Sequence, residues 1–222
     1  MARADLAALR AEQRDLAARA VTRDALGEVR RIGGVDISAS RFEREVHAAI
    51  VVLDWPSLEE VCRAGATQEA PLPYLTGLLG FREVPAAAAA WAALERKPDL
   101  LLVDGQGLEH PRRCGVATHL GVTLDVPSIG VAKSRLCGTW PELPEEAGAA
   151  VPITDRGEVV GTLLRSRLRA RPIHVSVGHR VSLATALGWV RATLRGRRLP
   201  EPTRRAHDAA ALVRRDFLAR RG

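Results

Sequence analysis

Residues 33–62 read GGVDISASRFEREVHAAIVVLDWPSLEEVC, and this stretch decides the fold class. Its apolar runs are separated by short polar turns, which predicts three strands, over 35–38, 46–54 and 58–62. Because the connections are short, consecutive strands are expected to pair antiparallel as a meander. Before the stretch, leucines at helical spacing predict a helix over residues 1–30, and the Gly33-Gly34 pair breaks this pattern.

After the meander, helical and strand-like segments alternate along the chain. Further strands are predicted over 99–103, 128–132, 158–168 and 172–177, the last two as a hairpin. Helices are predicted over 85–96, with Pro85 in the first turn, over 115–120 and 182–194, and from about 202 to the C-terminus. No repeat or linker interrupts the pattern. The sequence therefore predicts a single α/β domain over 1–222, a mixed β-sheet flanked by helices, on which the helix in 1–30 packs.

The amino-acid composition indicates which binding partners and which cellular compartment to expect. Among 222 residues, 33 Lys and Arg against 26 Asp and Glu leave a net charge of +7, which attracts polyanions such as nucleic acid. The three cysteines form no CxxC pair, so neither a disulfide framework nor a zinc knuckle is expected. No signal peptide or membrane span is predicted. We expect a cytoplasmic protein with no membrane contact and no obligate protein partner.

Three acidic residues stand at unusual places in this pattern. Asp36 and Asp104 each lie in or just after a short apolar strand beside glycine, where a carboxylate is costly to bury. If the two strands are neighbours, the carboxylates face each other across the sheet. Glu83 stands just before the helix that starts at Pro85 and is a candidate third member of the cluster. Such oxygen donors are typical of a Mg²⁺ or Mn²⁺ site. Taken singly, a capping or surface role is the commoner one for each residue.

The segment 103–119, VDGQGLEHPRRCGVATH, resembles the DG-x-G-x-x-HPR-x-x-G-x-A-x-H signature of the endonuclease V family. Further segments resemble the family's other motifs in the same order, namely GVD at 34–36, PYLTG at 73–77, FRE at 81–83, IGVAKSRL at 129–136, GHRVS at 178–182 and LPEPTR at 199–204. Several ordered motifs of this length make the resemblance specific, and it extends over nearly the whole chain.

The resemblance implies a ribonuclease H-like fold and a metal-dependent DNA repair endonuclease. Such an enzyme recognises deoxyinosine, the product of adenine deamination, and hydrolyses the second phosphodiester bond on its 3′ side, leaving 3′-hydroxyl and 5′-phosphate ends. The implied cofactor is Mg²⁺, with Mn²⁺ able to substitute. The implied catalytic residues are Asp36, Glu83, Asp104, Lys133 and His207, of which Asp36, Glu83 and Asp104 hold the metal. The implied contacts to DNA and the lesion are Tyr74, Gly77, Leu79, Gly105, His110 and Arg112.

Two departures from the family pattern leave alternatives open. The family's wedge loop is commonly PYIPG, and here Leu75 and Thr76 replace its Ile and second Pro. After the LPEPTR motif, many members have an Asp where this chain has His207, followed here by Asp208, so either side chain is a candidate for the fourth site residue. The motifs also leave open whether one or two metal ions are used.

Two rival functions remain beside the deoxyinosine nuclease. One is an endoribonuclease of the same family that cleaves inosine-containing RNA, since the motifs do not decide the sugar. The other is a basic nucleic-acid-binding module without catalytic activity. Retention of Asp36, Glu83 and Asp104 at motif positions argues against the second rival.

Overall fold

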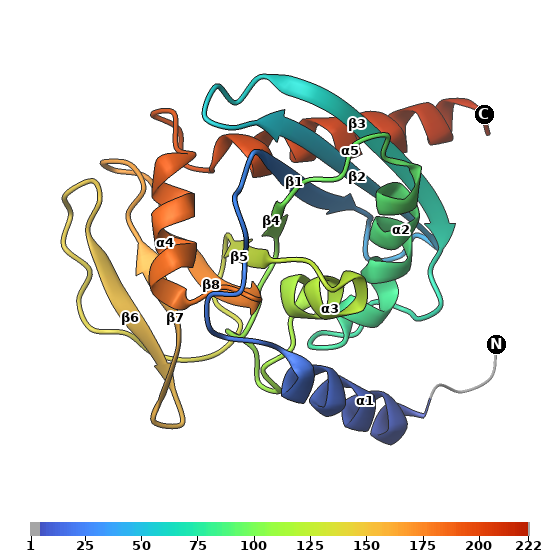
Figure 1. Ribbon diagram of the computed structural model, residues 1–222. Helices are drawn as coiled ribbons and strands as arrows, with labels where there is room; N and C mark the ends of the chain where they lie inside the picture. Colours follow the sequence, from blue (N-terminus) through green and yellow to red (C-terminus); the bar gives the residue numbers. More distant parts are fainter. Residues whose placement is uncertain (1–4, 222) are drawn as a thin grey trace.

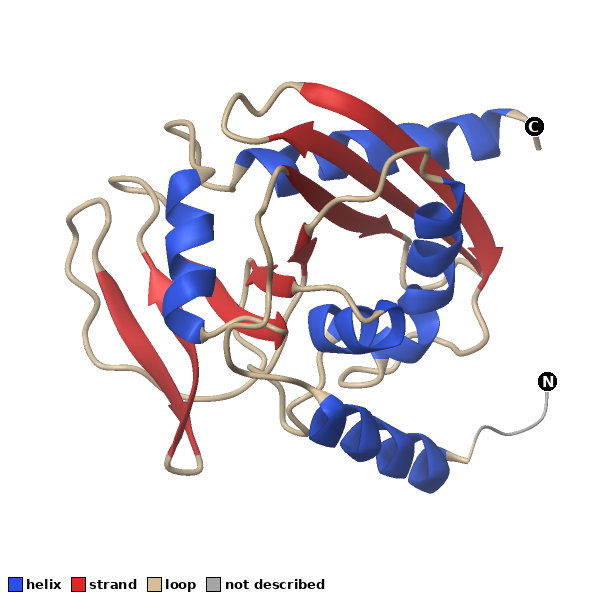
Figure 2. Cartoon of the chain, viewed as in Figure 1, coloured by secondary structure: helices blue, strands red, loops and turns tan. Residues whose placement is uncertain are grey.

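The computed structural model describes residues 5–221, which form one mixed sheet with helices on both faces (Figures 1 and 2). Over these residues the strands lie in the order β3-β2-β1-β4-β5-β8-β7-β6. The strands are β1 (Arg31–Ser38), β2 (Glu45–Asp54), β3 (Glu60–Glu69), β4 (Leu100–Asp104), β5 (Ser128–Ala132), β6 (Ala150–Asp155), β7 (Glu158–Leu164) and β8 (Ile173–His179). The helices are α1 (Leu6–Arg19), α2 (Leu79–Ala93), α3 (Val116–Leu124), α4 (Leu183–Ala192) and α5 (Glu201–Ala219).

The pairing of the strands confirms the predicted α/β class with a mixed sheet. Strands β1, β2 and β3 form the antiparallel meander. Strands β4 and β5 then join parallel to β1, and β8 pairs antiparallel with β5. The predicted hairpin of β7 and β8 is also present.

Each face of the sheet has its own apolar core. On one face, Ile32, Leu100 and Leu102 pack with residues of α4 and α5. On the other face, Val35 and Leu101 pack with residues of α2 and α3. Alternation of neighbouring residues between the two cores is the period-two pattern of a strand buried on both faces. Helix α1 lies outside these layers beside α3, at the lower edge of Figure 1.

The N-terminal prediction was wrong in its extent, because the helix ends at Arg19 and residues 20–30 form neither helix nor strand. The backbone there is held by the segment after β8. Arg180 N–H donates to the Val21 carbonyl at 2.6 Å, and Ala25 N–H donates to the Arg180 carbonyl at 3.0 Å. Tertiary pairing therefore overrides the helical spacing of the last apolar residues. None of the described helices is both long and apolar enough to cross a membrane.

The start of α2 also differs from the prediction. The helix begins at Leu79, so Pro85 lies inside it and Glu83 lies within the helix rather than before it. A proline in that position cannot donate to the carbonyl four residues earlier, which made the preceding residues look non-helical. Gly80 permits a close approach, since a Cβ there would meet His119 Nδ1 at 2.5 Å. Packing of this first turn on α3 stabilises it despite the glycine and the proline.

Both edge strands were poorly predicted. Strand β3 extends to Glu69, beyond the predicted end at residue 62, and β6 was not predicted. β6 contains Pro152, which a central strand does not tolerate but an edge strand does. Since edge strands are half exposed, their apolar patterns are weak, and β3 and β6 form the two edges of this sheet.

Candidate active site

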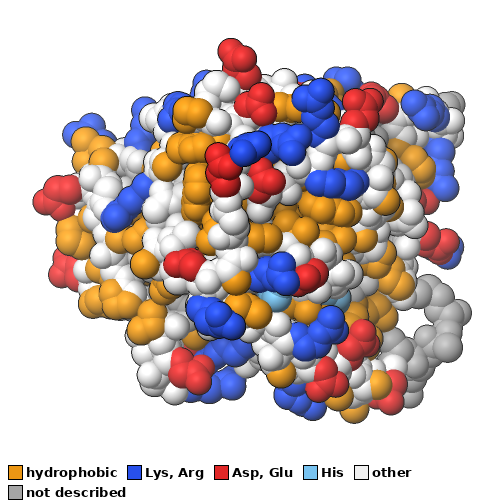
Figure 3. Space-filling view, in the orientation of Figure 1, with side chains coloured by type: hydrophobic (Ala, Val, Ile, Leu, Met, Phe, Trp, Pro, Cys, Tyr) orange, Lys and Arg blue, Asp and Glu red, His pale blue; other side chains and the backbone are white. Residues whose placement is uncertain are grey.

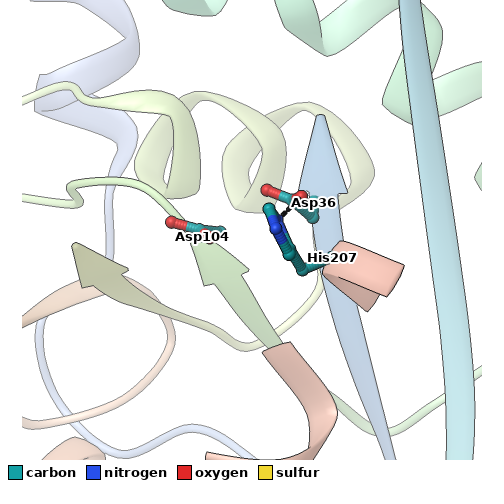
Figure 4. A group of neighbouring side chains, drawn as sticks. All are labelled: Asp36, Asp104 and His207. Carbon is teal, nitrogen blue, oxygen red and sulfur yellow. Dashed lines mark hydrogen bonds and ion pairs between the residues drawn. The ribbon is translucent and has the colours of Figure 1, made fainter. Parts of the chain in front are cut away.

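Asp36 and Asp104 are neighbours at the carboxyl ends of two parallel strands. Val35 in β1 is in register with Val103 in β4, so the next residue of each strand is an aspartate at the same level of the sheet. Figure 4 shows both carboxylates on the same side, next to His207. In open α/β sheets, ligands bind at the carboxyl ends of the strands. The two strands are neighbours in the sheet, so the condition under which the two carboxylates face each other is met.

His207 comes from α5, which crosses β1 at close range. A Cβ on Gly34 would lie 1.8 Å from the Pro202 carbonyl oxygen, so glycine at position 34 allows the first turn of α5 to rest on the strand. One and a half turns further along, His207 Nδ1 is 2.9 Å from Asp36 Oδ2. Ligand atoms of Asp36, Asp104 and His207 all lie within 4.8 Å of one another.

The carboxylates of the cluster are electrostatically unfavourable without a cation. Burial, and then the charge of Asp104, raises the pKa of Asp36 to about 6, although the hydrogen bond with His207 opposes the shift. Burial, helped by the charges of Asp36 and Asp104, raises the pKa of Glu83 to about 8 against the opposing charge of Arg82. Like charges that crowd in this way favour a positive partner.

Lys133 supplies one positive charge from the end of β5. Its ammonium forms an ion pair with the carboxylate of Asp104. Lys133 also lines a cleft of about 360 Å³ together with Asp36, Asp104, Glu83 and His207. All five residues that the family resemblance marks as catalytic therefore face one cleft, although Glu83 is outside the tight group of ligand atoms.

The donor set fits a hard divalent cation. Two carboxylates and one imidazole offer oxygen and nitrogen ligands, and no thiolate is among them. Carboxylate oxygens are the ligands that Mg²⁺ and Mn²⁺ prefer, and a mixed oxygen and imidazole set also suits Mn²⁺. Such an ion fits between Asp36, Asp104 and His207, and Glu83 lines the same cleft.

A second cavity, of about 260 Å³, adjoins the cleft and shares Leu79, Gln106 and Val116 with it. Tyr74 and Gly77 lie on its rim and wall. Tyr74 is 38% exposed, the guanidinium of Arg41 lies 5.5 Å from its ring centroid, and the loop that carries it leads into α2. We call this cavity the side pocket. Of the six predicted DNA and lesion contacts, Tyr74, Gly77, Leu79 and His110 line it.

The loop at the mouth of the side pocket is held by Gln13 of α1, which the sequence did not single out. The Gln13 amide is buried, and its Nε2 donates to the carbonyls of Gly77 at 3.0 Å and Cys114 at 2.7 Å. Its Oε1 accepts from Arg112 Nε at 2.5 Å, and Arg112 Nη2 donates to the Gly77 carbonyl at 2.6 Å. No local pattern marks Gln13, because its partners lie 64 to 101 residues away.

His110 belongs to the same network. Its Nε2 lies 3.1 Å from the Gly77 carbonyl, and its Nδ1 accepts from Arg112 N–H at 3.1 Å. Burial, and then the charge of Arg112, lowers the pKa of His110 to about 4, so the ring is neutral at pH 7 with its proton on Nε2. Both ring nitrogens therefore have partners in the chain, and His110 offers the side pocket an aromatic wall.

The remaining candidates lie apart from the side pocket or outside the site. Gly105 lines the cleft, and Arg112 is bound to Gln13 and Gly77.

Asp208 pairs with Arg204 at 2.8 Å, which leaves His207 as the residue beside Asp36. Arg204 also binds Glu201, and Arg180 binds Asp125, so these arginines pair with carboxylates outside the cleft. The sequence had left the choice between His207 and Asp208 open.

The fold is thus of the α/β class with a ribonuclease H-like mixed sheet, and two carboxylates meet at the ends of strands β1 and β4. Residues 14–208 match the family model described as Endonuclease V. The chain belongs to the endonuclease V family, which is a family of nucleases.

Solved structures agree with the family match. The endonuclease V of Streptomyces avermitilis is 38% identical, with a TM-score of 0.90 over 99% of this chain and 96% of that one. The catalytic domain of human endonuclease V is 36% identical, with a TM-score of 0.88 over 96% of this chain and 97% of that one. The endonuclease V of Ciona intestinalis is 29% identical, with a TM-score of 0.82 over 95% of this chain and 98% of that one. That structure is a complex with DNA that contains an inosine followed by a ribo-adenosine.

Proposed function

We propose that this protein is a metal-dependent DNA repair endonuclease that hydrolyses the second phosphodiester bond 3′ to a deoxyinosine. The observation that carries the proposal is the adjacency of two spaces. One is the cleft lined by Asp36, Asp104 and His207, and the other is the side pocket, which shares three lining residues with the cleft. A reaction centre beside a base-sized pocket suits cleavage at a set distance from a flipped base.

In the cleft, Asp36, Asp104 and His207 would hold the divalent ion, with Glu83 beside them. When bound, Mg²⁺ or Mn²⁺ supplies an activated water and neutralises charge on the phosphate. Lys133, paired with Asp104, would fix the orientation of that carboxylate and offset part of the negative charge of the incoming phosphate. His207, through its 2.9 Å contact, would hold the rotamer of Asp36.

The side pocket would take the hypoxanthine base. Hypoxanthine has an oxygen at position 6, where adenine has an amino group, so a backbone N–H group at that point accepts the first base and rejects the second. Helix α2 begins in the pocket wall without a side-chain cap, and the first N–H groups of a helix have no intrahelical acceptor. Leu79 and Gly80 present such N–H groups. Tyr74 would stack in the space that the flipped base leaves.

A second candidate differs only in the sugar. The DNA bound by the Ciona relative carries a ribo-adenosine after the inosine, which favours an enzyme that tolerates or prefers ribose next to the lesion. Cleavage of matched strands that carry inosine with deoxyribose or ribose, at the lesion and at the next nucleotide, separates the two candidates. Faster cleavage of the ribose strands would assign the protein to RNA.

The proposal is tested by nicking of a duplex with one deoxyinosine, mapped to the nucleotide with and without Mg²⁺. The expected product has a 3′-hydroxyl at the second bond 3′ to the lesion and forms only with the metal. Asp36→Ala is expected to abolish nicking while lesion binding stays measurable. Asp208→Asn is the matched control, since this carboxylate pairs with Arg204 outside the cleft. Cleavage at adenine duplexes at the same rate, or full activity of Asp36→Ala, would refute the proposal.

A further inference from the structure

A groove rich in arginine lies next to the side pocket. It encloses about 520 Å³ between α1, the loop at 111–113 and the turn between β6 and β7. We call it the basic groove. Figure 3 shows basic side chains, with acidic ones between them, over the lower part of this face, around the place that α1 occupies in Figure 1. The arginines that line the basic groove are Arg10, Arg14, Arg112, Arg113 and Arg156.

Most of this positive charge has no acidic partner within the groove. Arg113 is neutralised by Asp155 at 2.7 Å and by Glu158 at 2.9 Å. Arg156 is 3.8 Å from Asp155, a carboxylate that Arg113 already holds. Among residues 5–221, Arg10 and Arg14 make no ion pair, and both are exposed.

The arrangement costs stability without a bound anion. Arg10 and Arg14 are four residues apart in α1, so their charges share one face of the helix and repel. Arg112 donates hydrogen bonds to neutral oxygens of Gln13 and Gly77, so no carboxylate compensates its positive charge there. Burial, and then the charges of Arg10 and Arg14, lowers the pKa of Arg112. Several cations that gather in a concave surface are typical of a site for phosphate groups.

The basic groove, the side pocket and the cleft follow one another in space. Gln13 lines the side pocket, and its Oε1 lies 2.5 Å from Nε of Arg112, which lines the basic groove. The side pocket also shares Leu79, Gln106 and Val116 with the cleft. The side pocket therefore adjoins the cleft and, through the contact of Gln13 with Arg112, the basic groove.

We propose that the basic groove binds the sugar-phosphate backbone on the 5′ side of the lesion. The inference rests on the proposed function, in which the scissile phosphate, 3′ to the lesion, lies in the cleft. A strand whose base enters the side pocket and whose 3′ portion crosses the cleft then leaves on the opposite side, where the arginines of α1 stand. Binding there would hold the strand on both sides of the extracted base.

The test measures equilibrium binding in EDTA, so that cleavage does not interfere. Three labelled duplexes carry one deoxyinosine. One extends on both sides, one ends just 5′ to the lesion, and one ends shortly after the scissile bond on the 3′ side. The variant Arg10→Ala/Arg14→Ala is compared with Arg10→Lys/Arg14→Lys, which keeps the charge. The matched control is Arg96→Ala/Arg197→Ala, which removes two exposed arginines outside the basic groove.

Removal of the α1 arginines is expected to weaken binding about tenfold for the two duplexes that keep the 5′ arm, and to lower the salt dependence by about one to two phosphate contacts. The duplex without the 5′ arm should bind parent and variant equally, and the lysine variant should bind like the parent. An equal loss with all three duplexes, or no loss, would overturn the basic groove assignment. Failure of the parent to prefer deoxyinosine over adenine would refute the proposed function instead.

Discussion

Replacement of Gln13 by alanine tests how the side pocket is held together. The substitution removes two neutral hydrogen bonds, to the carbonyls of Gly77 and Cys114, and one charge-assisted bond from Arg112. At about 1 kcal/mol for each neutral bond and about 2 kcal/mol for the charged one, the free energy of unfolding should fall by roughly 4 kcal/mol. Urea denaturation followed by tryptophan fluorescence measures this loss.

Two further variants sharpen the Gln13 experiment. Gln13→Glu keeps an acceptor for Arg112 but turns an oxygen toward the carbonyls of Gly77 and Cys114, so it is expected to destabilise at least as much as alanine. Glu12→Ala, an exposed neighbour on α1, should change stability by no more than about 0.5 kcal/mol. Affinity for a deoxyinosine duplex should fall with Gln13→Ala, since the Tyr74 loop loses its anchor. A Gln13→Ala protein within about 1 kcal/mol of the parent would refute the reasoning.

The other predictions concern the side pocket and the buried His119, which packs against Gly80. Tyr74→Ala should weaken binding of a deoxyinosine duplex by roughly tenfold and slow bound-state cleavage less, whereas Tyr74→Phe should bind like the parent; an unchanged affinity of the alanine variant argues against stacking. Leu79→Ala should cleave guanine-containing duplexes more readily, because a wall of the side pocket is removed; selectivity equal to that of the parent would exclude this role. Burial lowers the pKa of His119 from 6.5 to about 4, so the unfolded chain binds a proton over this range that the folded chain does not. Stability should therefore fall as the pH drops from about 6.5 to about 4, by up to about 3 kcal/mol from this group. In urea titrations at each pH, the free energy of unfolding of His119→Asn should fall less steeply with decreasing pH than that of the parent. Equal pH dependence of the two proteins would contradict the lowered pKa of His119.

The sequence predicts best those elements whose pattern follows from burial. Strand β5 was predicted with its observed ends, Ser128 and Ala132, because a strand covered on both faces is a continuous apolar run. The edge strand β6 was missed, since Pro152 and its half-exposed neighbours lack that signal. Helix α2 was placed too late, because packing of Gly80 on His119 stabilises a first turn that local propensity disfavours.

The residues of the cleft were easier to predict from the sequence than the residues around it. Asp36 and Asp104 stood out as carboxylates at the ends of apolar strands, and strand pairing brings them together. The choice between His207 and Asp208 needed the rotation of α5, which directs the first toward Asp36 and the second toward Arg204. Gln13 and the basic groove depend on contacts between α1 and distant loops, and these contacts leave no local pattern in the sequence.

Location of Mn²⁺ by its anomalous scattering, in crystals of the protein grown with the ion at pH 8, tests whether the two strand-end aspartates share a cation. We expect an anomalous peak bonded to carboxylate oxygens of both Asp36 and Asp104, and its loss in the Asp104→Asn variant. Crystals in which Mn²⁺ leaves this cleft empty, or binds elsewhere while both aspartates keep their present positions, would contradict the metal-dependent mechanism.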